Sequence, residues 1–139
     1  MRVLFDTNIY IDAFIDRGPQ SIYSSVIFVL VANKYIEAFV SPHTLSNINY
    51  ILRKEMPEDK RRELIKDICK FSEVVPVDNE IVCKALNESR ISDFEDALQY
   101  ACAEAIGADY ICTNDIDGFK GMDIKSLTAV ELFALPELP

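Results

Sequence analysis

Four aspartates stand where a sheet of parallel strands would bring them to one edge. Asp6 directly follows a short, largely apolar run at the N-terminus, and Asp115 comes two residues after the apolar run that ends at Thr113. Asp96 lies early in the segment that leads into that second run, and Asp93 precedes it by three residues, a spacing that places both on one helix face. Because sites in parallel sheets form beyond the carboxyl ends of the strands, we expect these carboxylates to converge.

Carboxylates that converge need a cation. Two of them about 4 Å apart repel by about 4 kcal/mol at an effective dielectric constant of about 20, and an unpaired charge after a buried strand is costly. A divalent metal with oxygen ligands removes both costs. The chain has one histidine and no Cys-x-x-Cys pair, which favours Mg²⁺ or Mn²⁺ over zinc. Simpler roles stay open. Asp93 could serve as no more than a helix cap, and Asp6 and Asp115 could each serve only as acceptors for the amides of their loops.

Strands alternating with helices are expected to position these aspartates. Short apolar runs typical of buried strands occupy five segments: 1–5, 35–40, 73–77, 109–113 and 123–127. Periodicity and capping residues predict helices over 8–15, 20–33, 41–55, 59–71, 78–87, 93–106 (capped by Ser92 or Asp93) and 130–133. The alternation predicts an α/β fold, a three-layer α/β/α sandwich with a central parallel sheet of four to five strands. We expect one domain over residues 1–135 and a frayed tail over 136–139.

The composition indicates a cytoplasmic protein whose core needs no disulfides. The chain has 139 residues, half of them hydrophobic, which fits one domain. No apolar run is long enough to cross a membrane, and the N-terminus turns polar too early for a secretion signal. The four cysteines have apolar neighbours in the sequence and are expected to be buried free thiols in a reducing compartment. The net charge of −9 argues against nucleic-acid binding, unless acids in one cleft hold a metal.

Three segments that carry the aspartates resemble the acidic motifs of PIN domains. They are Asp-Thr-Asn-Ile-Tyr-Ile-Asp at 6–12, Asp-Ala-Leu-Gln-Tyr-Ala at 96–101 and Thr-Asn-Asp at 113–115. Their order and spacing match over residues 2–133. The segment 41–48 also resembles its PIN counterpart, with one departure, since Asn47 stands where many PIN nucleases have a glutamate.

This resemblance implies a metal-dependent ribonuclease, often the toxin of a bacterial or archaeal toxin–antitoxin pair. The expected substrate is single-stranded RNA, and the expected cofactor is Mg²⁺ or Mn²⁺, which would lower the pKa of a bound water and polarise the phosphoryl oxygen for in-line attack. The expected protein partners are an antitoxin and a second copy of the chain in a homodimer. The residues that the resemblance implicates in catalysis are Asp6, Asp96, Asp115 and Asn47.

The same resemblance suggests roles for the neighbouring residues. The three catalytic aspartates would be the metal ligands, with Asp93 as a fourth acidic contributor. Thr7, Asn8 and Thr113 would orient ligands or water. Asp117 is a weaker candidate on the loop that carries Asp115.

Two alternatives to an active nuclease stay open. An amide at Asn47 brings no charge, which weakens a site for a second metal most, so the chain could be a catalytically weakened or inactive PIN-like module that binds protein or RNA. Phosphoryl-transfer domains also place an aspartate after a first parallel strand. The haloacid-dehalogenase pattern, however, needs a second aspartate at the position of Asn8, and the receiver pattern needs an early acidic pair that is missing here.

Half of the basic residues lie between positions 53 and 70. A ridge of this kind could guide an RNA backbone toward the acidic cleft. Acidic residues are interleaved with it, so a solvated and electrically balanced surface is the other interpretation. The residues are Arg53, Lys54, Lys60, Arg61, Arg62, Lys66 and Lys70.

Overall fold

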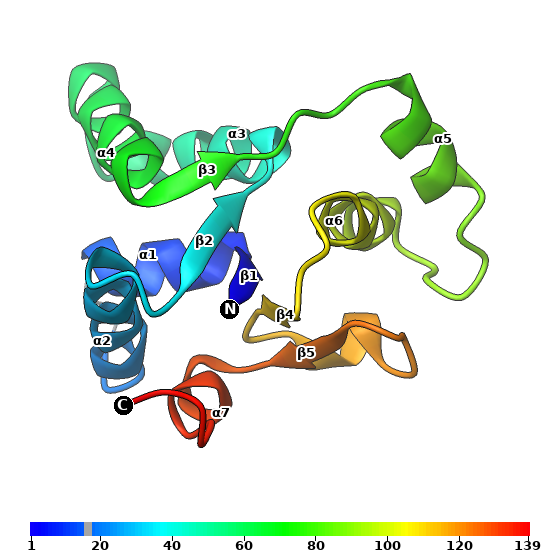
Figure 1. Ribbon diagram of the computed structural model, residues 1–139. Helices are drawn as coiled ribbons and strands as arrows, with labels where there is room; N and C mark the ends of the chain where they lie inside the picture. Colours follow the sequence, from blue (N-terminus) through cyan, green and yellow to red (C-terminus); the bar gives the residue numbers. More distant parts are fainter. Residues whose placement is uncertain (16–17) are drawn as a thin grey trace.

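A parallel sheet of five strands forms the centre of the molecule (Figure 1). The computed structural model describes residues 1–15 and 18–139. The strands run in the spatial order β3-β2-β1-β4-β5, and every neighbouring pair is parallel, which confirms the predicted sheet. The strands are β1 (Arg2–Phe5), β2 (Glu37–Val40), β3 (Ser72–Val74), β4 (Tyr110–Cys112) and β5 (Lys125–Leu127).

Helices cover both faces of this sheet, so the three-layer α/β/α prediction is also confirmed (Figure 1). On one face lie α5 and α6, and on the other lie α1, α2 and α7, with α3 and α4 toward the β3 edge. The helices are α1 (Thr7–Ile15), α2 (Ser21–Ala32), α3 (Pro42–Ile51), α4 (Glu58–Phe71), α5 (Asn79–Leu86), α6 (Phe94–Ala105) and α7 (Ala129–Phe133).

The central strand β1 contributes to a hydrophobic core on each face. Val3 and Phe5 belong to the cluster that includes side chains of α1 and α2, whereas Leu4 belongs to the cluster beneath α5 and α6. All three side chains are fully buried. Successive side chains of a strand point to opposite faces, so a strand covered on both sides appears in the sequence as an unbroken apolar run. This burial leaves Asp6 as the first polar side chain after the strand.

Capping residues set where the site helices begin. The Ser41 hydroxyl accepts a hydrogen bond from the backbone N–H of Thr44 and so starts α3. The Asp93 carboxylate accepts one from the backbone N–H of Asp96 at 3.0 Å. Of the two caps that the sequence offered for α6, Asp93 is therefore the one used, and Ser92 precedes it.

Several expected element bounds are wrong. The helix expected over 41–55 ends at Ile51 and continues as a 3₁₀ turn, η1 (Leu52–Lys54). The strand expected over 35–40 begins at Glu37, because residues 34 and 35 still close α2 through hydrogen bonds to its carbonyls. The strand expected over 73–77 ends at Val74, where its register with β2 ends. A second 3₁₀ turn, η2 (Ile116–Phe119), was not expected.

The expectation that all four cysteines are buried is also wrong. Cys102 and Cys112 are buried free thiols as predicted, but Cys69 and Cys83 are exposed. Both exposed thiols lie on amphipathic helices, where residues adjacent in sequence point about 100° apart, so apolar sequence neighbours do not imply burial. Across residues 1–15 and 18–139, no helix is long and apolar enough to span a membrane.

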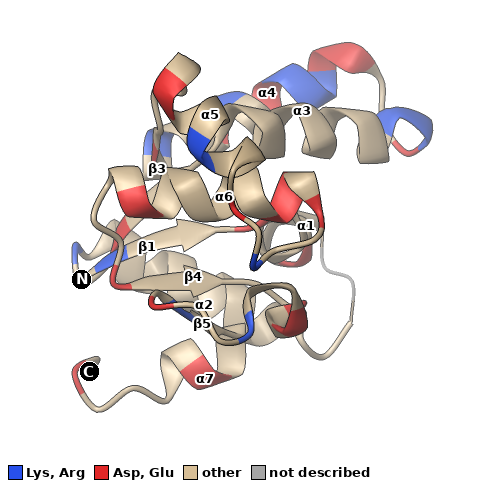
Figure 2. Ribbon diagram, turned by 90° about the vertical axis from the view of Figure 1, so that its right-hand side faces the viewer, with Lys and Arg blue, Asp and Glu red and all other residues tan. Residues whose placement is uncertain are grey.

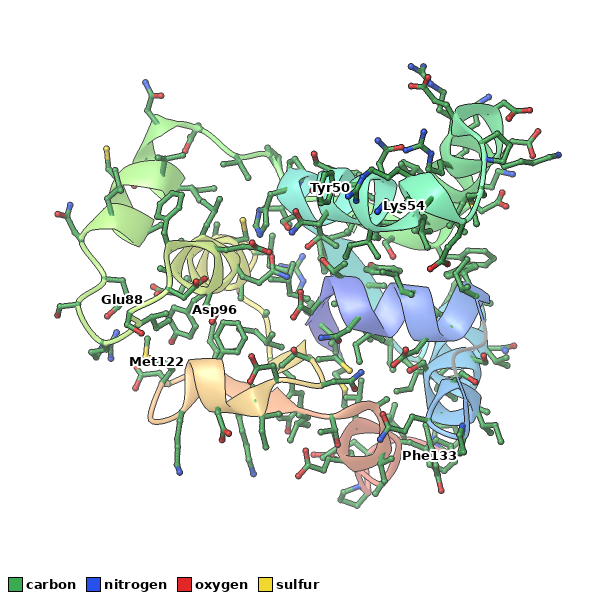
Figure 3. All side chains as sticks on the ribbon, turned by 180° about the vertical axis from the view of Figure 1, so that it is seen from behind. Tyr50, Lys54, Glu88, Asp96, Met122 and Phe133 are labelled. Atoms are coloured by element: carbon green, nitrogen blue, oxygen red, sulfur yellow. The ribbon has the colours of Figure 1, made fainter. Side chains whose placement is uncertain are left out.

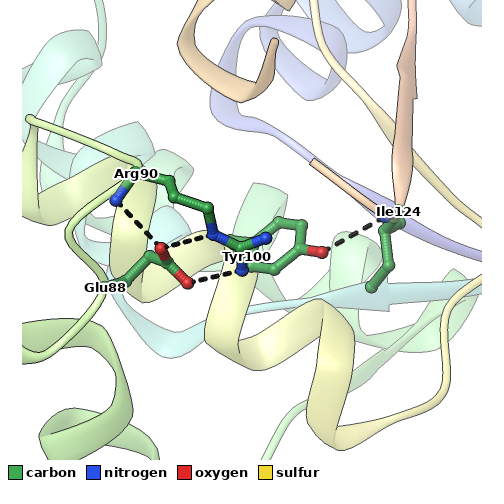
Figure 4. Close-up of polar contacts among 4 residues, drawn as sticks. All are labelled: Glu88, Arg90, Tyr100 and Ile124. Atoms are coloured by element: carbon green, nitrogen blue, oxygen red, sulfur yellow. Dashed lines mark hydrogen bonds and ion pairs between the residues drawn. The ribbon is translucent and has the colours of Figure 1, made fainter. Parts of the chain in front are cut away.

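The loop that leads into α6 is held by its own ion pair (Figure 4). Glu88 Oε1 accepts hydrogen bonds from the Arg90 backbone N–H at 3.0 Å and from Arg90 Nε at 2.9 Å, while Oε2 accepts one from Nη2 at 2.9 Å. Within α6, the Tyr100 hydroxyl accepts a hydrogen bond from the backbone N–H of Ile124 at 3.2 Å. The first set of contacts holds the loop in one conformation, and the last joins α6 to the segment before β5.

We predict that Tyr10→Phe lowers the free energy of unfolding by about 1–3 kcal/mol, since it leaves a buried hydroxyl without its partner. Tyr10 is 1% exposed, packs against Phe5 and Phe28, and its hydroxyl donates to Ser72 Oγ at 2.7 Å. Urea unfolding measures the change. Adding Ser72→Ala should recover part of the loss because both polar partners are then absent, and Tyr35→Phe, at an exposed tyrosine, is the control. A loss as large for Tyr35→Phe would contradict this account.

Candidate functional site

Asp6 is half-buried at the carboxyl end of β1, and hydrogen-bond donors surround its carboxylate. Its Oδ2 accepts a hydrogen bond from Thr113 Oγ1 at 2.8 Å. Its Oδ1 accepts one from the backbone N–H of Thr7 at 2.7 Å and a longer one from Gln99 Nε2 at 3.4 Å. Donors from the residue that follows β4, from α1 and from α6 therefore orient both oxygens.

The loop after β4 is built around Thr113 and brings Asp115 to the same edge of the sheet. Thr113 is fully buried, and its Oγ1, which donates to Asp6, also accepts a hydrogen bond from the backbone N–H of Asp115 at 3.1 Å. Between them, the Asn114 backbone N–H donates to Asn8 Oδ1 at 3.2 Å. Asn8 thus holds this loop against α1, and Thr113 joins it to Asp6. The predicted roles of both residues toward ligands or water stay predictions.

Asp96 lies in the first turn of α6 (Figure 3), and its carboxylate lies beside Gly118 in η2. A Cβ atom added to Gly118 would lie 2.6 Å from Asp96 Oδ2, so only glycine lets the carboxylate sit this close to the η2 backbone. Asp93 binds the Asp96 backbone N–H as a cap. Asp93 is therefore the N-cap of α6, and its role toward a metal stays a prediction.

The environment of Asp96 is unfavourable for a negative charge. Burial first, and then the neighbouring carboxylates of Asp93, Asp6, Asp115 and Glu95, raise the pKa of Asp96 to about 6 from an ordinary value of 3.8. The predicted acids therefore lie close enough to act on one another. A bound cation would reverse this effect, because it stabilises the ionised form that burial and repulsion oppose.

A pocket of about 260 Å³ opens beside Asp6, between α1, α3 and α6. Asn47 and Glu95 form its opposite wall, and Asn47 Nδ2 donates a hydrogen bond to Glu95 Oε1 at 2.6 Å. Thr7 also lines this pocket and is 9% exposed, and its hydroxyl Oγ1 has no hydrogen-bond partner within the described part of the chain.

A buried polar network behind Asp6 was not expected from the sequence. Gln99 is 3% exposed, and besides its contact with Asp6 it accepts a hydrogen bond from Ser41 Oγ at 2.9 Å and donates one to Thr44 Oγ1 at 3.3 Å. His43 Nε2 lies 3.3 Å from Ser41 Oγ. Burial lowers the pKa of His43, an effect that Glu95 and Asp6 oppose. This network links the N-terminus of α3 to α6 and so holds both walls of the pocket.

The structure brings together most, but not all, of the predicted residues. Asp6, Asp96 and Asp115 share one edge of the sheet, but among the described residues no three His, Cys, Asp or Glu side chains are arranged closely enough to hold a metal ion as they stand. Their oxygen chemistry and mutual repulsion fit a divalent cation, and the ligand set stays a prediction. Asp117 is exposed on η2, and its part in the site also stays a prediction.

Three residues near the aspartates escaped the sequence analysis, although weak signals were present. Gln99 interrupts an apolar helix face one turn after Asp96. Glu95 directly precedes Asp96, so the two acids are adjacent in the sequence. Gly118 follows the acidic turn directly. None of these signals is specific, because each depends on contacts with residues distant in the sequence.

Basic and acidic residues alternate along η1 and α4 (Figure 2). Within α4, Arg62 pairs with Glu58, Lys60 with Glu63 and Lys70 with Asp67, all on the exposed surface. The Arg53 guanidinium lies 3.7 Å from the centre of the Tyr50 ring. The balanced surface is therefore the better description, and ion pairs this exposed contribute little to stability.

A family model and several solved structures match this chain. The model, described as PIN domain, matches residues 2–117. No curated protein matches significantly in sequence. VapBC2 from Rickettsia felis, bound to a DNA fragment from its promoter, is 20% identical with a TM-score of 0.69, over 92% of this chain and 98% of that one.

Two further solved structures show the same fold. A toxin–antitoxin complex from Klebsiella pneumoniae is 20% identical with a TM-score of 0.67, over 91% of this chain and 97% of that one. VapC20 from Mycobacterium tuberculosis, a toxin that cleaves the sarcin–ricin loop, is 15% identical with a TM-score of 0.61, over 78% and 86%.

We predict that Asp96→Asn stabilises the protein at neutral pH when divalent ions are absent. The pKa of Asp96 is higher in the folded chain, about 6 against an ordinary 3.8, so the folded state binds its proton more tightly than the unfolded state. That contribution to stability is complete below about pH 3.8 and is lost as the pH rises through about 6. The variant should therefore melt at a higher temperature than the wild type at pH 7.5, with a smaller difference at pH 4.5.

Thermal melts in EDTA at the two pH values measure this. Glu104→Gln, which removes an exposed charge from the same helix, is the control. An equal shift in melting temperature for Asp96→Asn at both pH values would contradict the raised pKa of Asp96 as the cause.

Proposed function

The chain belongs to the PIN domain family, whose model matches residues 2–117, and we propose that it is a metal-dependent endonuclease that cleaves single-stranded RNA. The observation that carries this proposal is the group of mutually repelling carboxylates around Asp96, at the sheet edge where Asp6 is held ready by three donors. Carboxylates that oppose one another's ionisation are more frequent at functional sites than in structural clusters, because a bound cation relieves the repulsion.

Asp6, Asp96 and Asp115 are the residues that would hold Mg²⁺ or Mn²⁺, with Asp93 adding negative charge nearby. Such an ion supplies Lewis-acid chemistry, since it favours the deprotonation of water and neutralises charge on the phosphoryl group. The chain itself provides orientation. Thr113 and the Thr7 backbone N–H fix the Asp6 carboxylate, and the same Thr113 hydroxyl fixes the Asp115 backbone.

We also propose that the protein acts as the toxin of a toxin–antitoxin pair. Similar folds occur in toxin–antitoxin complexes of Rickettsia felis and Klebsiella pneumoniae. Exposed apolar side chains on α2 and α7, among them Ile22, Val29 and Val130, provide surface of the kind that protein partners bury. Binding of an antitoxin or of a second copy there would be consistent with this proposal.

We predict that Asp6→Asn lowers the rate of RNA cleavage by more than about 100-fold, because it removes charge and the orientation of a ligand together. Cleavage of labelled single-stranded RNA in Mg²⁺ or Mn²⁺ measures the effect, and EDTA should stop the wild-type reaction. Asp123→Asn is the matched control, since Asp123 is exposed and precedes β5 at the opposite edge of the sheet. Metal-independent cleavage, or equal activity of both variants, would contradict the proposal. Metal binding without cleavage would indicate a binding module instead.

A further inference from the structure

An exposed aromatic side chain stands on α3 beside the pocket next to Asp6. Asn47 and Ile51 line that pocket, and Tyr50 lies between them in the sequence, three residues after Asn47. Residues three apart on a helix are surface neighbours, with Cβ atoms about 5–6 Å apart. Figure 3 shows Tyr50 on α3 and Lys54 on the turn that follows it. Tyr50 therefore stands at the rim of the pocket without lining it.

Arg53 covers one face of the Tyr50 ring and leaves the other face open. Its guanidinium lies 3.7 Å from the ring centre, and its Nη1 donates a hydrogen bond to the Tyr50 carbonyl at 2.7 Å. These two contacts hold the ring and the cation together. Even so, Tyr50 is 62% exposed, more than any other aromatic residue in the described part of the chain. A ring fixed in this way loses little conformational entropy when a second planar group stacks on it.

Arg53 and Lys54 differ in their partners from three basic residues of α4. Lys60, Arg62 and Lys70 each pair with an acid, whereas neither Arg53 nor Lys54 forms an ion pair with any residue of 1–15 or 18–139. The chain as a whole carries a charge of −9, which repels a polyanion over most of its surface. Two cations without acidic partners therefore attract a phosphate backbone to this side of the pocket.

We propose that Tyr50 and Arg53 form a platform that binds a nucleotide of single-stranded RNA beside the acidic edge of the sheet. One base stacks on the open face of the Tyr50 ring, and a backbone phosphate binds Arg53, whose guanidinium has five donors and uses one of them on the Tyr50 carbonyl. This inference rests on the proposed nuclease function and names residues that position its substrate. Stacking tolerates every base, because every base has a π-face, so the platform holds RNA without reading its sequence.

Variants at position 50 separate the aromatic face from the rest of the side chain. Tyr50→Leu removes the ring and stays apolar, whereas Tyr50→Phe keeps the ring. Tyr35→Leu is the matched control, since Tyr35 is 52% exposed and precedes β2, at the opposite edge of the sheet from Asp6. The probes are a short labelled oligouridylate and the same oligomer made abasic, which keeps its phosphates and lacks its bases. Stopped-flow fluorescence anisotropy in Mg²⁺ separates binding from any later cleavage, and thermal melts show that each variant is folded.

We expect Tyr50→Leu to weaken binding of the oligouridylate by about 5- to 100-fold, and Tyr50→Phe and Tyr35→Leu to bind it like the wild type. The abasic oligomer should bind Tyr50→Leu and the wild type equally, because the base that the ring would stack on is absent. Wild-type affinity of Tyr50→Leu for the oligouridylate would overturn the inference. An equal loss with both oligomers would also overturn it, since the ring would then act without a base.

The salt dependence of binding tests the contact with the phosphate. Each phosphate of a single strand that a protein neutralises contributes about −0.7 to the slope of log affinity against log salt. Arg53→Gln should therefore make this slope shallower by about 0.7, whereas Lys70→Gln, at a residue paired with Asp67, should leave it unchanged. A lower melting temperature with an unchanged slope would assign Arg53 only to the end of α3 and overturn the phosphate contact.

Cleavage assays with the same variants keep the platform and the proposed nuclease apart. If Tyr50→Leu cleaves RNA with an unchanged KM, the platform is overturned and the nuclease stands. If the oligouridylate binds through Tyr50 but is not cleaved in Mg²⁺ or Mn²⁺, the platform stands as an RNA-binding surface and the nuclease proposal fails.

Discussion

The carboxylate of Asp6 imposes the constraint from which the arrangement of the site follows. It comes directly after three fully buried residues of the central strand, where a negative charge without partners is costly. The fold meets this need with a threonine hydroxyl after β4, a backbone N–H of α1 and an amide of α6. Because the three donors converge on one carboxylate, the loop after β4, α1 and α6 lie at the same edge of the sheet. The loop carries Asp115 and α6 carries Asp96, so these acids lie at that edge too.

Burial and the neighbouring acids oppose the ionisation of Asp96. Burial comes first and four neighbouring carboxylates follow, and together they raise the pKa of this side chain. Proteins tolerate such local conflicts mainly at functional sites, where ligand binding relieves them. The two buried clusters on either side of the sheet supply the stability that allows it.

Helix geometry directs the acids at the start of α6 to different neighbours. Asp93 caps the helix, Glu95 contacts Asn47 on α3, and Asp96 contacts the η2 backbone at Gly118. The Asn47 amide contacts a carboxylate from another helix, a pairing that neither local sequence segment indicates.

The sequence by itself determined the class of the fold and the positions of its main acids. Unbroken apolar runs predicted strands buried on both faces, and their alternation with helices predicted a parallel sheet whose carboxyl ends share an edge, which places Asp6 and Asp115 together. Only the tertiary structure decided which other side chains lie against these acids. Gln99, Glu95 and Gly118 act through contacts with residues up to 93 positions away, and the exposure of Cys69 depends on how a helix is rotated against the core. Local periodicity reports which residues share a helix face, but it does not report what packs against that face.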